Sequence, residues 1–460
     1  MTVTAISELR LCPGVEVLCD DNIPARNERD WNSQVATRPL AVVRPTTPEG
    51  VASVLRICST HGIAVVPQGG LTGLCGGAQP SSDCVALSLE RMVGVEELDP
   101  VAGTATVRAG TTLAAIQKAA EEAGLYCGLD IGSRGSCTIG GNLSTNAGGN
   151  RVIRYGMARQ MVLGLEVALA DGTLMTSLNK MLKNNAGYDL KHLFIGSEGT
   201  LGVITRAVLR LSPLPASTST AMCALKDFGS VLRLLDGARR RLGPSLSAFE
   251  VMWQDFFDVA TSRVPGIRSP FSETHAFFVL LEAQGIDADS DATKFEGWLG
   301  EQLEEGVLED AVIAQSLSEA DAFWTLRDAG SEFASFMGPF AGFDIGLPVN
   351  QIDAYVQDCR RTMAKELPGC LTYFLGHIAD GNIHIVAYVP GAEMQPFSKI
   401  DEIVYRLVQQ YGGTISAEHG IGTKKKKYLA FSRSPEELAL MRMLKTTLDP
   451  KGILNPGKVL

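Results

Sequence analysis

QGGLTGLCGG, at residues 68–77, is the stretch of sequence that decides the fold class. It leaves a strongly apolar run at residues 63–67 and leads into another at residues 85–89. Short apolar runs bounded by glycine predict buried strands. Five glycines in ten residues cannot pack a core, but they let backbone N–H groups approach a ligand closely. We therefore interpret the stretch as a ligand-binding loop between two strands, with a flexible turn as the alternative.

The residues before this loop predict an α/β unit. An apolar run at residues 40–43 is followed by Thr47-Pro48-Glu49, which offers an N-cap hydroxyl, a proline at the first helical position and an early acid. Apolar residues then recur at helical spacing, and His61-Gly62 ends the predicted helix. Strand, helix and strand therefore precede the loop.

Two more segments share the composition of the loop. Residues 132–149 mix glycine with small hydroxyl and amide side chains, and residues 196–202 precede an apolar strand. Many neutral donors suit a pyrophosphate and a ribityl chain. No G-x-G-x-x-G lies between a strand and a helix, and G-x-x-x-x-G-K-[ST] is absent. The three segments therefore predict one large cofactor threaded between subdomains, and they disfavour an NAD site or a P-loop.

The composition excludes several classes of protein. The 460 residues carry a formal net charge of −10, which argues against a nucleic-acid partner. The ten cysteines include no C-x-x-C pair, so iron–sulfur clusters and structural zinc are not expected. Reduced thiols, no secretory signal in residues 1–21 and no long apolar span predict a cytoplasmic protein without a membrane segment.

The texture of the chain changes near Pro213. Glycine thins out, and strand-like runs alternate with helix-like ones to about residue 412, which predicts an α+β second domain. The turn-rich ending at residues 453–458 returns to the texture of the first domain.

The sharpest local signal is a pair of histidines around a predicted hairpin. Asp380-Gly381 between two apolar runs predicts a two-residue loop, which would place His377 opposite His384 on one face. Two imidazoles so placed can share one metal ion. Two polar histidines on a strand, without a metal, are the alternative.

Glu418 and His419 could complete such a site. Neighbours in an extended segment point to opposite sides, so Glu418 could face a metal while His419 faces elsewhere in the same site. A set of two histidines and one carboxylate leaves open positions for a substrate. An unligated His419 is a natural general base near neutral pH, and a structural histidine beside a glycine turn is the alternative.

At these residues the sequence resembles the FAD-dependent D-2-hydroxyacid dehydrogenases of the vanillyl-alcohol oxidase superfamily, in the branch of D-2-hydroxyglutarate and D-lactate dehydrogenases. The resemblance covers nearly the whole chain in the family's order, and its motifs together are highly specific. The matching stretches are Pro67-Gln-Gly-Gly-x-Thr-Gly73, Gly135-Ser-x-x-Ile-Gly-Gly-Asn142, Thr145-Asn-Ala-Gly-Gly149, Arg154-Tyr-Gly156, Gly196-Ser-Glu-Gly-Thr-Leu-Gly202, His377-x-x-Asp-Gly-Asn-x-His384, Glu418-His-Gly-Ile-Gly422 and Asp449-Pro-x-Gly-Ile-Leu-Asn-Pro-Gly457.

The resemblance implies an α+β fold of two parts. A two-subdomain FAD-binding domain takes residues 1–213 and a C-terminal segment, residues 413–460, while an inserted cap domain takes residues 214–412 and carries the substrate site. The glycine-rich loop at residues 68–77 has no histidine that could bind the flavin covalently. The FAD is therefore expected to be dissociable, although Cys75 is present.

The resemblance also implies roles for individual residues. His377, His384 and Glu418 are the implied metal ligands, and His419 is the implied catalytic base. Arg327 is the implied catalytic and carboxylate-binding arginine, which composition alone would make a solvated helix charge. The implied substrate contacts are Arg327, Ser331, His377, His384 and His419. The implied FAD contacts are Pro67, Gln68, Gly69, Gly70, Thr72, Gly73, Gly135, Ser136, Gly140, Gly141, Asn142, Thr145, Asn146, Gly149, Gly199, Val203, Ile204, His419 and Asn455.

Two residues depart from the D-2-hydroxyglutarate branch. Gly342 stands where that branch often has lysine, and Val386 stands where it tends to have asparagine. Both changes remove polar groups from the expected substrate wall, which puts glutarate in doubt and admits a smaller or more apolar acid.

The expected function is therefore FAD- and metal-dependent oxidation of a D-2-hydroxy acid, such as D-2-hydroxyglutarate or D-lactate, to the 2-oxo acid. Zinc is the expected metal, and manganese also fits the ligands. The expected acceptor is external, an electron-transfer flavoprotein or a quinone, with oxygen and a homodimeric state left open. The alternatives are another alcohol or lactone oxidase of the superfamily, a non-catalytic subunit like those of glycolate oxidase complexes, and a zinc hydrolase.

Overall fold

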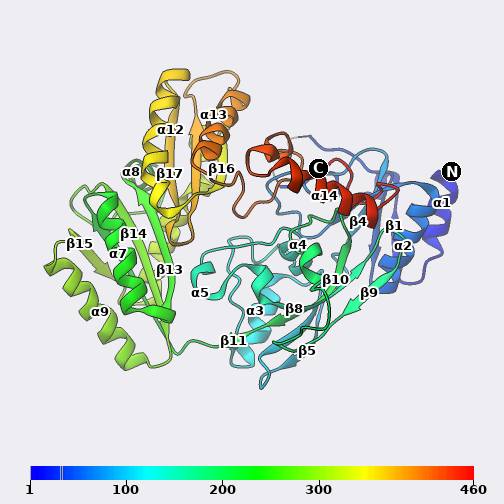
Figure 1. The fold of residues 1–460 in the computed structure, drawn as a ribbon, viewed down its shortest axis with the longest axis horizontal. Coiled ribbons are helices and arrows are strands. Elements are labelled where there is room, and N and C mark those ends of the chain that lie inside the picture. The colour runs from blue at the N-terminus through cyan, green and yellow to red at the C-terminus, as the bar shows by residue number, and fades with distance from the viewer. Residues whose placement is uncertain (1, 32, 34) are drawn as a thin grey trace. The chain divides into compact units, whose positions relative to one another are not determined.

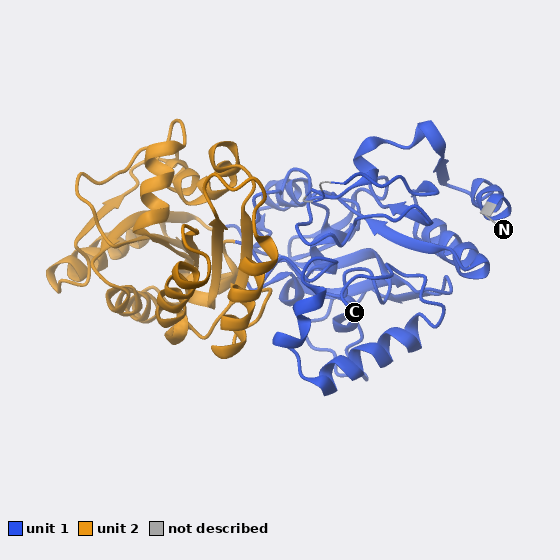
Figure 2. Cartoon of the chain, turned by 90° about the horizontal axis from the view of Figure 1, so that it is seen from above, with its two compact units in different colours: residues 1–149, 156–214, 418–460 blue, residues 150–155, 215–417 orange. Residues whose placement is uncertain are grey.

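The computed structural model describes residues 2–31, 33 and 35–460. The chain divides into two compact units, which Figure 2 distinguishes by colour. Unit 1 consists of residues 1–149, 156–214 and 418–460, and unit 2 of residues 150–155 and 215–417.

This division differs from the expected one at residue 214, which belongs to unit 1, and at two longer segments. Residues 150–155 belong to unit 2, because Arg151 pairs with Glu282 at 2.9 Å and the Tyr155 hydroxyl donates to Gln284 at 2.7 Å. Residues 413–417 also stay with unit 2, because Thr414 and Gly346 exchange backbone hydrogen bonds of 2.8 and 3.0 Å. Both differences arise from long-range contacts that composition does not reveal.

The first sheet of unit 1 contains the strand, helix and strand that precede the glycine-rich loop. Its order is β1-β2-β4-β3, with β2 and β3 parallel to β4 and β1 antiparallel to β2. The predicted cap of α2 is confirmed, since the Thr47 side chain accepts from Gly50 N and Gly62 ends the helix in the left-handed conformation. The elements are α1 (Thr2–Arg10), β1 (Val15–Leu18), β2 (Ala41–Pro45), α2 (Pro48–His61), β3 (Ala64–Gln68) and β4 (Cys84–Ser88).

The second sheet of unit 1 is antiparallel throughout, in the order β5-β6-β10-β8-β9, and a small pair joins β7 to β11. Its elements and the remaining helices of the unit are β5 (Val95–Asp99), β6 (Thr104–Arg108), α3 (Leu113–Glu122), β7 (Leu125–Tyr126), α4 (Ile139–Ser144), β8 (Val162–Ala168), β9 (Leu174–Ser177), α6 (Lys191–Phe194), β10 (Val203–Arg210), β11 (Ser212–Pro213) and α14 (Pro435–Leu448).

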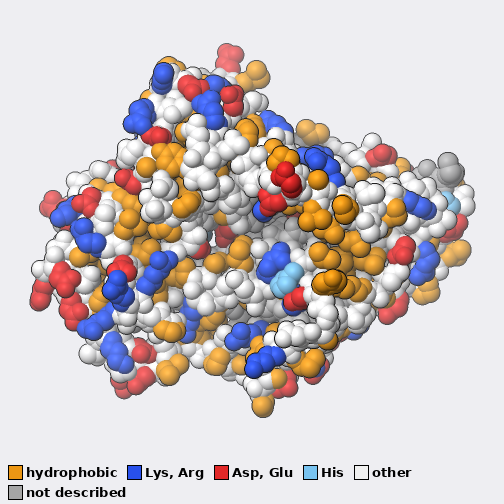
Figure 3. Space-filling view, in the orientation of Figure 1, with side chains coloured by type: hydrophobic (Ala, Val, Ile, Leu, Met, Phe, Trp, Pro, Cys, Tyr) orange, Lys and Arg blue, Asp and Glu red, His pale blue; other side chains and the backbone are white. Residues whose placement is uncertain are grey.

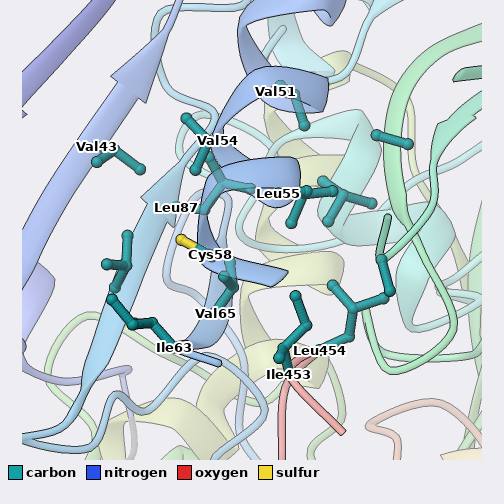
Figure 4. Packing of buried hydrophobic residues seen from close by; sticks show 14 of the residues in the cluster. Val43, Val51, Val54, Leu55, Cys58, Ile63, Val65, Leu87, Ile453 and Leu454 are labelled. Atoms are coloured by element: carbon teal, nitrogen blue, oxygen red, sulfur yellow. The ribbon is translucent and has the colours of Figure 1, made fainter. Parts of the chain in front are cut away.

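The core of unit 1 joins residues from both ends of the chain. Side chains of α2, among them Val54 and Leu55, pack with Val65 of β3 and with Ile453 and Leu454 of the C-terminal segment (Figure 4). The backbone of Val65 continues this contact: its N–H donates to the Ile453 carbonyl at 2.7 Å, and its carbonyl accepts from Asn455 N at 2.8 Å. The C-terminal segment is therefore part of the first sheet's core.

Unit 2 is built on an antiparallel sheet of seven strands in the order β15-β12-β14-β13-β17-β18-β16 (Figure 1). The elements are α5 (Val152–Tyr155), β12 (Ser217–Leu225), α7 (Phe228–Arg241), β13 (Leu246–Trp253), α8 (Gln254–Arg263), β14 (Phe277–Gly285), α9 (Ala288–Glu304), β15 (Asp310–Ile313), α10 (Leu317–Arg327), α11 (Ala334–Met337), β16 (Ala341–Gly346), α12 (Ile352–Glu366), β17 (Leu371–His377), β18 (Asn382–Tyr388) and α13 (Phe397–Gln410).

The two faces of this sheet are covered by different helices. Met252, Leu280, Leu375 and Val386 form a cluster with buried side chains of α8 and α10. Alternate residues point to the other face, where Phe343 packs on Tyr405 of α13 and the Arg360 guanidinium of α12 lies over the Phe374 ring. The first face carries the residues of the candidate site.

Acidic and basic side chains are interspersed over the face that Figure 3 presents. None of the helices in the described ranges combines the length and the hydropathy that a membrane-spanning segment requires.

Candidate functional site

The three glycine-rich segments come together within unit 1. A Cβ on Gly70 would collide with the backbone carbonyl of Ser136, and one on Gly199 would lie 3.0 Å from the Pro67 ring. The Asn455 side-chain amide donates to the carbonyls of Gly77 at 2.9 Å and Glu198 at 2.7 Å. Residues from four distant parts of the sequence thus form one cradle of exposed backbone.

Backbone conformation marks the same cradle. Among the described residues, four non-glycine positions in these segments have positive φ angles: Leu71 (61°), Asn146 (51°), Glu198 (53°) and Asn455 (41°). Such conformations are costly and persist where the surrounding structure requires them, most often around ligand sites.

Two buried oxygens of the cradle lack a hydrogen-bond partner within the described part of the chain. Thr138 Oγ1 and Asn455 Oδ1 are buried without a hydrogen-bond partner among the described residues. Buried polar atoms are normally satisfied, so both oxygens favour a ligand or ordered water in this place.

Glu198 fixes the segment that contains Glu418 and His419. Its buried carboxylate accepts hydrogen bonds from Ile421 N at 2.7 Å and Gly422 N at 2.8 Å. Burial raises the pKa of Glu198, and the two N–H donors oppose this rise. Glu418 in turn accepts a hydrogen bond from the Gly149 backbone N–H. Within unit 1, the Glu-His pair therefore lies against the end of the second glycine-rich segment.

The histidine hairpin has a longer turn than the sequence predicts. Ile378–Asp380 form a turn of 3-10 helix, Gly381 adopts φ 84°, and His384 pairs across the strands with Leu375 rather than with His377. The predicted register is therefore wrong by two residues. Asp380 explains the difference, because its carboxylate accepts from Asn382 N at 3.1 Å and closes the wider turn.

A shift of two residues leaves the two histidines on the same face, because side chains alternate along a strand. The ring centroids of His377 and His384 lie 5.2 Å apart, with the planes at 80°. Unit 2 therefore brings the two predicted imidazoles together, although not as a directly opposed pair.

Glu250 lies beside this pair, on the neighbouring strand β13. It is opposite His377 on β13, is 1% exposed and approaches His377 Nδ1 at 2.6 Å with one carboxylate oxygen. Its other oxygen accepts from Arg327 Nε at 2.8 Å. Burial disfavours the carboxylate, but the charges and hydrogen bonds of Arg327 and His377 outweigh it and lower the pKa of Glu250 to about 2.

Arg327 is part of this network rather than a solvated charge. It ends α10, its side chain is 11% exposed, and Nη1 donates to Asp328 at 2.9 Å. Ser331 lies on the next turn, where its hydroxyl donates to the Asp328 carbonyl at 3.0 Å and its side chain is exposed.

Sequence reasoning missed Glu250 and Asp344. Asp344 is fully buried opposite His384, and it accepts from the Asn382 side chain at 2.9 Å and from the Ser416 hydroxyl at 3.3 Å. The available signal was a single carboxylate inside an otherwise apolar strand, since buried acids are rare unless they are paired.

Family models match most of the chain. A model described as "FAD binding domain" matches residues 39–177, and one described as "FAD linked oxidases, C-terminal domain" matches residues 214–459.

Curated relatives extend over nearly the full sequence. The chain is 39% identical over 451 residues to the mitochondrial D-2-hydroxyglutarate dehydrogenase of Arabidopsis thaliana, covering 97% of this chain and 80% of the relative. It is also 39% identical over 438 residues to the D-2-hydroxyglutarate dehydrogenase of Xanthomonas citri pv. viticola, covering 94% of this chain and 91% of the relative.

Solved structures share the fold at lower identity. An alkyldihydroxyacetonephosphate synthase superposes with a TM-score of 0.77 at 19% identity, covering 99% of this chain and 84% of the other. A substrate-bound p-cresol methylhydroxylase superposes with a TM-score of 0.78 at 17% identity, covering 99% of this chain and 96% of the other.

Proposed function

The chain belongs to the FAD-linked oxidase family, and from that membership we propose that it oxidises a D-2-hydroxy acid to the 2-oxo acid by hydride transfer to flavin N5. The expected family and the expected α+β fold of the vanillyl-alcohol oxidase type are both confirmed. The chain is an FAD-dependent oxidoreductase, as its relatives are. The observation that carries the choice of substrate class is the identity with D-2-hydroxyglutarate dehydrogenases over almost the whole sequence.

The cradle of unit 1 fits FAD. Glycine backbone stands where a Cβ would collide, as at Gly70, and the unpartnered oxygens of Thr138 and Asn455 can accept from a ligand. Neutral donors and bare backbone suit a pyrophosphate and a ribityl chain. We propose that the predicted FAD contacts in this cradle hold the cofactor non-covalently.

We further propose that His377, His384 and Glu418 hold a divalent metal. The two imidazoles share a face of unit 2, and Ser416, two residues before Glu418, is bonded to Asp344 opposite His384. Two nitrogens and a carboxylate suit zinc or manganese and leave positions for a substrate. A metal bound there would supply Lewis-acid polarisation of the substrate hydroxyl.

The protein's own side chains then have distinct tasks. His419 takes the hydroxyl proton as general base, which lets the hydrogen on Cα leave as hydride. Arg327 pairs with Glu250 through Nε and Nη2 and with Asp328 through Nη1, and its second Nη1 N–H binds the substrate carboxylate and so selects the D enantiomer. Electrons leave to an external acceptor, for which an electron-transfer flavoprotein and a quinone are our candidates.

Glu250 positions two of these groups. Its hydrogen bond to Nδ1 holds the His377 ring, whose Nε2 lies 3.0 Å from Arg327 Nη2, and its ion pair fixes the Arg327 guanidinium. Glu250→Gln keeps the shape but removes the charge, so we expect metal affinity to fall by roughly 10- to 100-fold while FAD remains bound. Metal content per flavin, titrated with a chelator, checks this result. Unchanged metal affinity would contradict the role, and Glu437→Gln on exposed α14 is the matched control.

The experiment that tests the proposed reaction is reduction of the bound flavin by 2-hydroxy acids without oxygen. We expect a D acid to bleach the visible flavin absorbance with formation of the 2-oxo acid, and the L enantiomer to leave it unchanged.

A further inference from the structure

We infer that the substrate of this site carries an apolar side chain on C2 rather than a second carboxylate. The inference rests on the proposed function and deepens it, because it concerns the side chain of the D-2-hydroxy acid. It departs from the substrate that the names of the curated relatives carry. It is supported by the residues that follow His384 on the same face of the unit 2 sheet.

Strand pairing defines what lies on this face. His384 on β18 is flanked by Leu375 on β17 and Asp344 on β16. Two residues further along β18, on the same face, Val386 is flanked by Tyr373 and Gly342. The two rows are about 7 Å apart, which is the reach of a four- or five-carbon acid whose hydroxyl is held at the histidines.

The second row is apolar and aromatic. Val386 and Tyr373 are buried in the cluster that also contains Phe333, while Met337 and Phe340 pack against it. The Phe333 and Tyr373 rings lie 6.1 Å apart. Gly342, on the edge strand β16, is exposed, whereas Val386 and Tyr373 are 7% and 9% exposed.

Two arginines of unit 2 already have carboxylate partners. Arg360 is paired with Asp255 at 2.6 Å, and Arg327 is held by Glu250 and Asp328. Burial and the neighbouring Tyr388 raise the pKa of the Tyr373 hydroxyl to about 12, although the positive charge of Arg263 on α8 lowers it. Apart from the Tyr373 and Tyr388 hydroxyls, the row is of low polarity, and a carboxylate placed there would lose hydration without gaining a cation from either paired arginine.

Binding of an apolar substrate side chain is favourable in the same surroundings. Each methylene that enters a hydrophobic pocket improves kcat/KM by roughly 10-fold or more. The matching substrates are D-2-hydroxy acids with a branched aliphatic or aromatic side chain, such as D-2-hydroxyisocaproate or D-3-phenyllactate.

The test compares kcat/KM of the FAD-loaded protein, with an artificial electron acceptor, for D-2-hydroxyisocaproate, D-3-phenyllactate, D-lactate and D-2-hydroxyglutarate. We expect at least one of the two apolar acids to exceed D-2-hydroxyglutarate by roughly 10-fold or more. A preference for D-2-hydroxyglutarate over both would overturn the inference while leaving the proposed function intact. Failure of every D acid would instead refute the proposed function.

A pair of variants at Gly342 separates charge from bulk. Gly342 has an ordinary φ, and a Cβ there would meet only the Phe340 ring at 3.6 Å, so a side chain is accommodated. Gly342→Lys should raise kcat/KM for D-2-hydroxyglutarate by roughly 10-fold by supplying the missing cation, whereas Gly342→Met of similar length should not. If wild-type protein favours D-2-hydroxyglutarate and Arg263→Ala abolishes that preference, Arg263 is the anchor and the apolar assignment is wrong.

Discussion

His419→Ala is expected to slow reduction of the flavin by a D-2-hydroxy acid roughly 1,000-fold, with FAD still bound. A positioned general base contributes about 100- to 10,000-fold, and the hydride cannot leave Cα while the hydroxyl keeps its proton. The backbone of the segment should survive the change, because Glu198 holds it through the N–H groups of Ile421 and Gly422.

Stopped-flow flavin absorbance measures this rate, and the flavin-to-protein ratio shows that the cofactor is retained. His61→Ala is the matched control, since that imidazole is bonded to Glu8 at 3.0 Å at the end of α2. A normal rate in His419→Ala would remove His419 from the role of base. Loss of FAD in the variant would show that the imidazole serves the cofactor.

Glu418→Gln is expected to lose the metal and the activity together. Glutamine can still accept the hydrogen bond from Gly149 N, so the local structure is preserved, but a neutral amide is a poor substitute for an anionic ligand. Lewis-acid activation is worth several kcal/mol, so we expect turnover to fall by roughly 1,000-fold.

Elemental analysis for zinc and manganese per flavin, together with turnover in metal-supplemented buffer, checks the second prediction. Full metal content in Glu418→Gln would mean that another group is the third ligand. Loss of activity with full metal content would assign Glu418 a task other than metal binding.

The sequence was sufficient for the family and for the cofactor cradle. The glycine-rich segments are contiguous motifs, so their ligand-binding chemistry can be predicted from the sequence alone. The family resemblance covered the chain in order. The same holds for α2, whose cap at Thr47 and terminating Gly62 are local signals that the structure confirms.

Features that depend on long-range pairing were not predictable in this way. Glu250 meets His377 only because β13 lies beside β17, and Asp344 meets His384 only because β16 lies beside β18. Both carboxylates are distant in sequence from the histidines that they contact. The hairpin register failed for a local reason, because the Asp380 side chain competes with the two-residue turn by bonding to the backbone.

Arg327 illustrates what resemblance adds. Without the resemblance it would have been interpreted as a solvated helix charge, while the structure places it in a buried pair with Glu250. Gly342 and Val386, which the resemblance predicts to differ from the D-2-hydroxyglutarate branch, stand opposite each other on paired strands.

The measurement that tests the central claim most directly is anaerobic bleaching of the purified flavoprotein by D- and L-2-hydroxy acids, before and after treatment with EDTA. We predict rapid bleaching by at least one D acid, no bleaching by its L enantiomer, loss of the reaction with EDTA and its return with zinc or manganese. Bleaching that ignores both the enantiomer and the chelator, or a flavin that no 2-hydroxy acid reduces, would contradict the account.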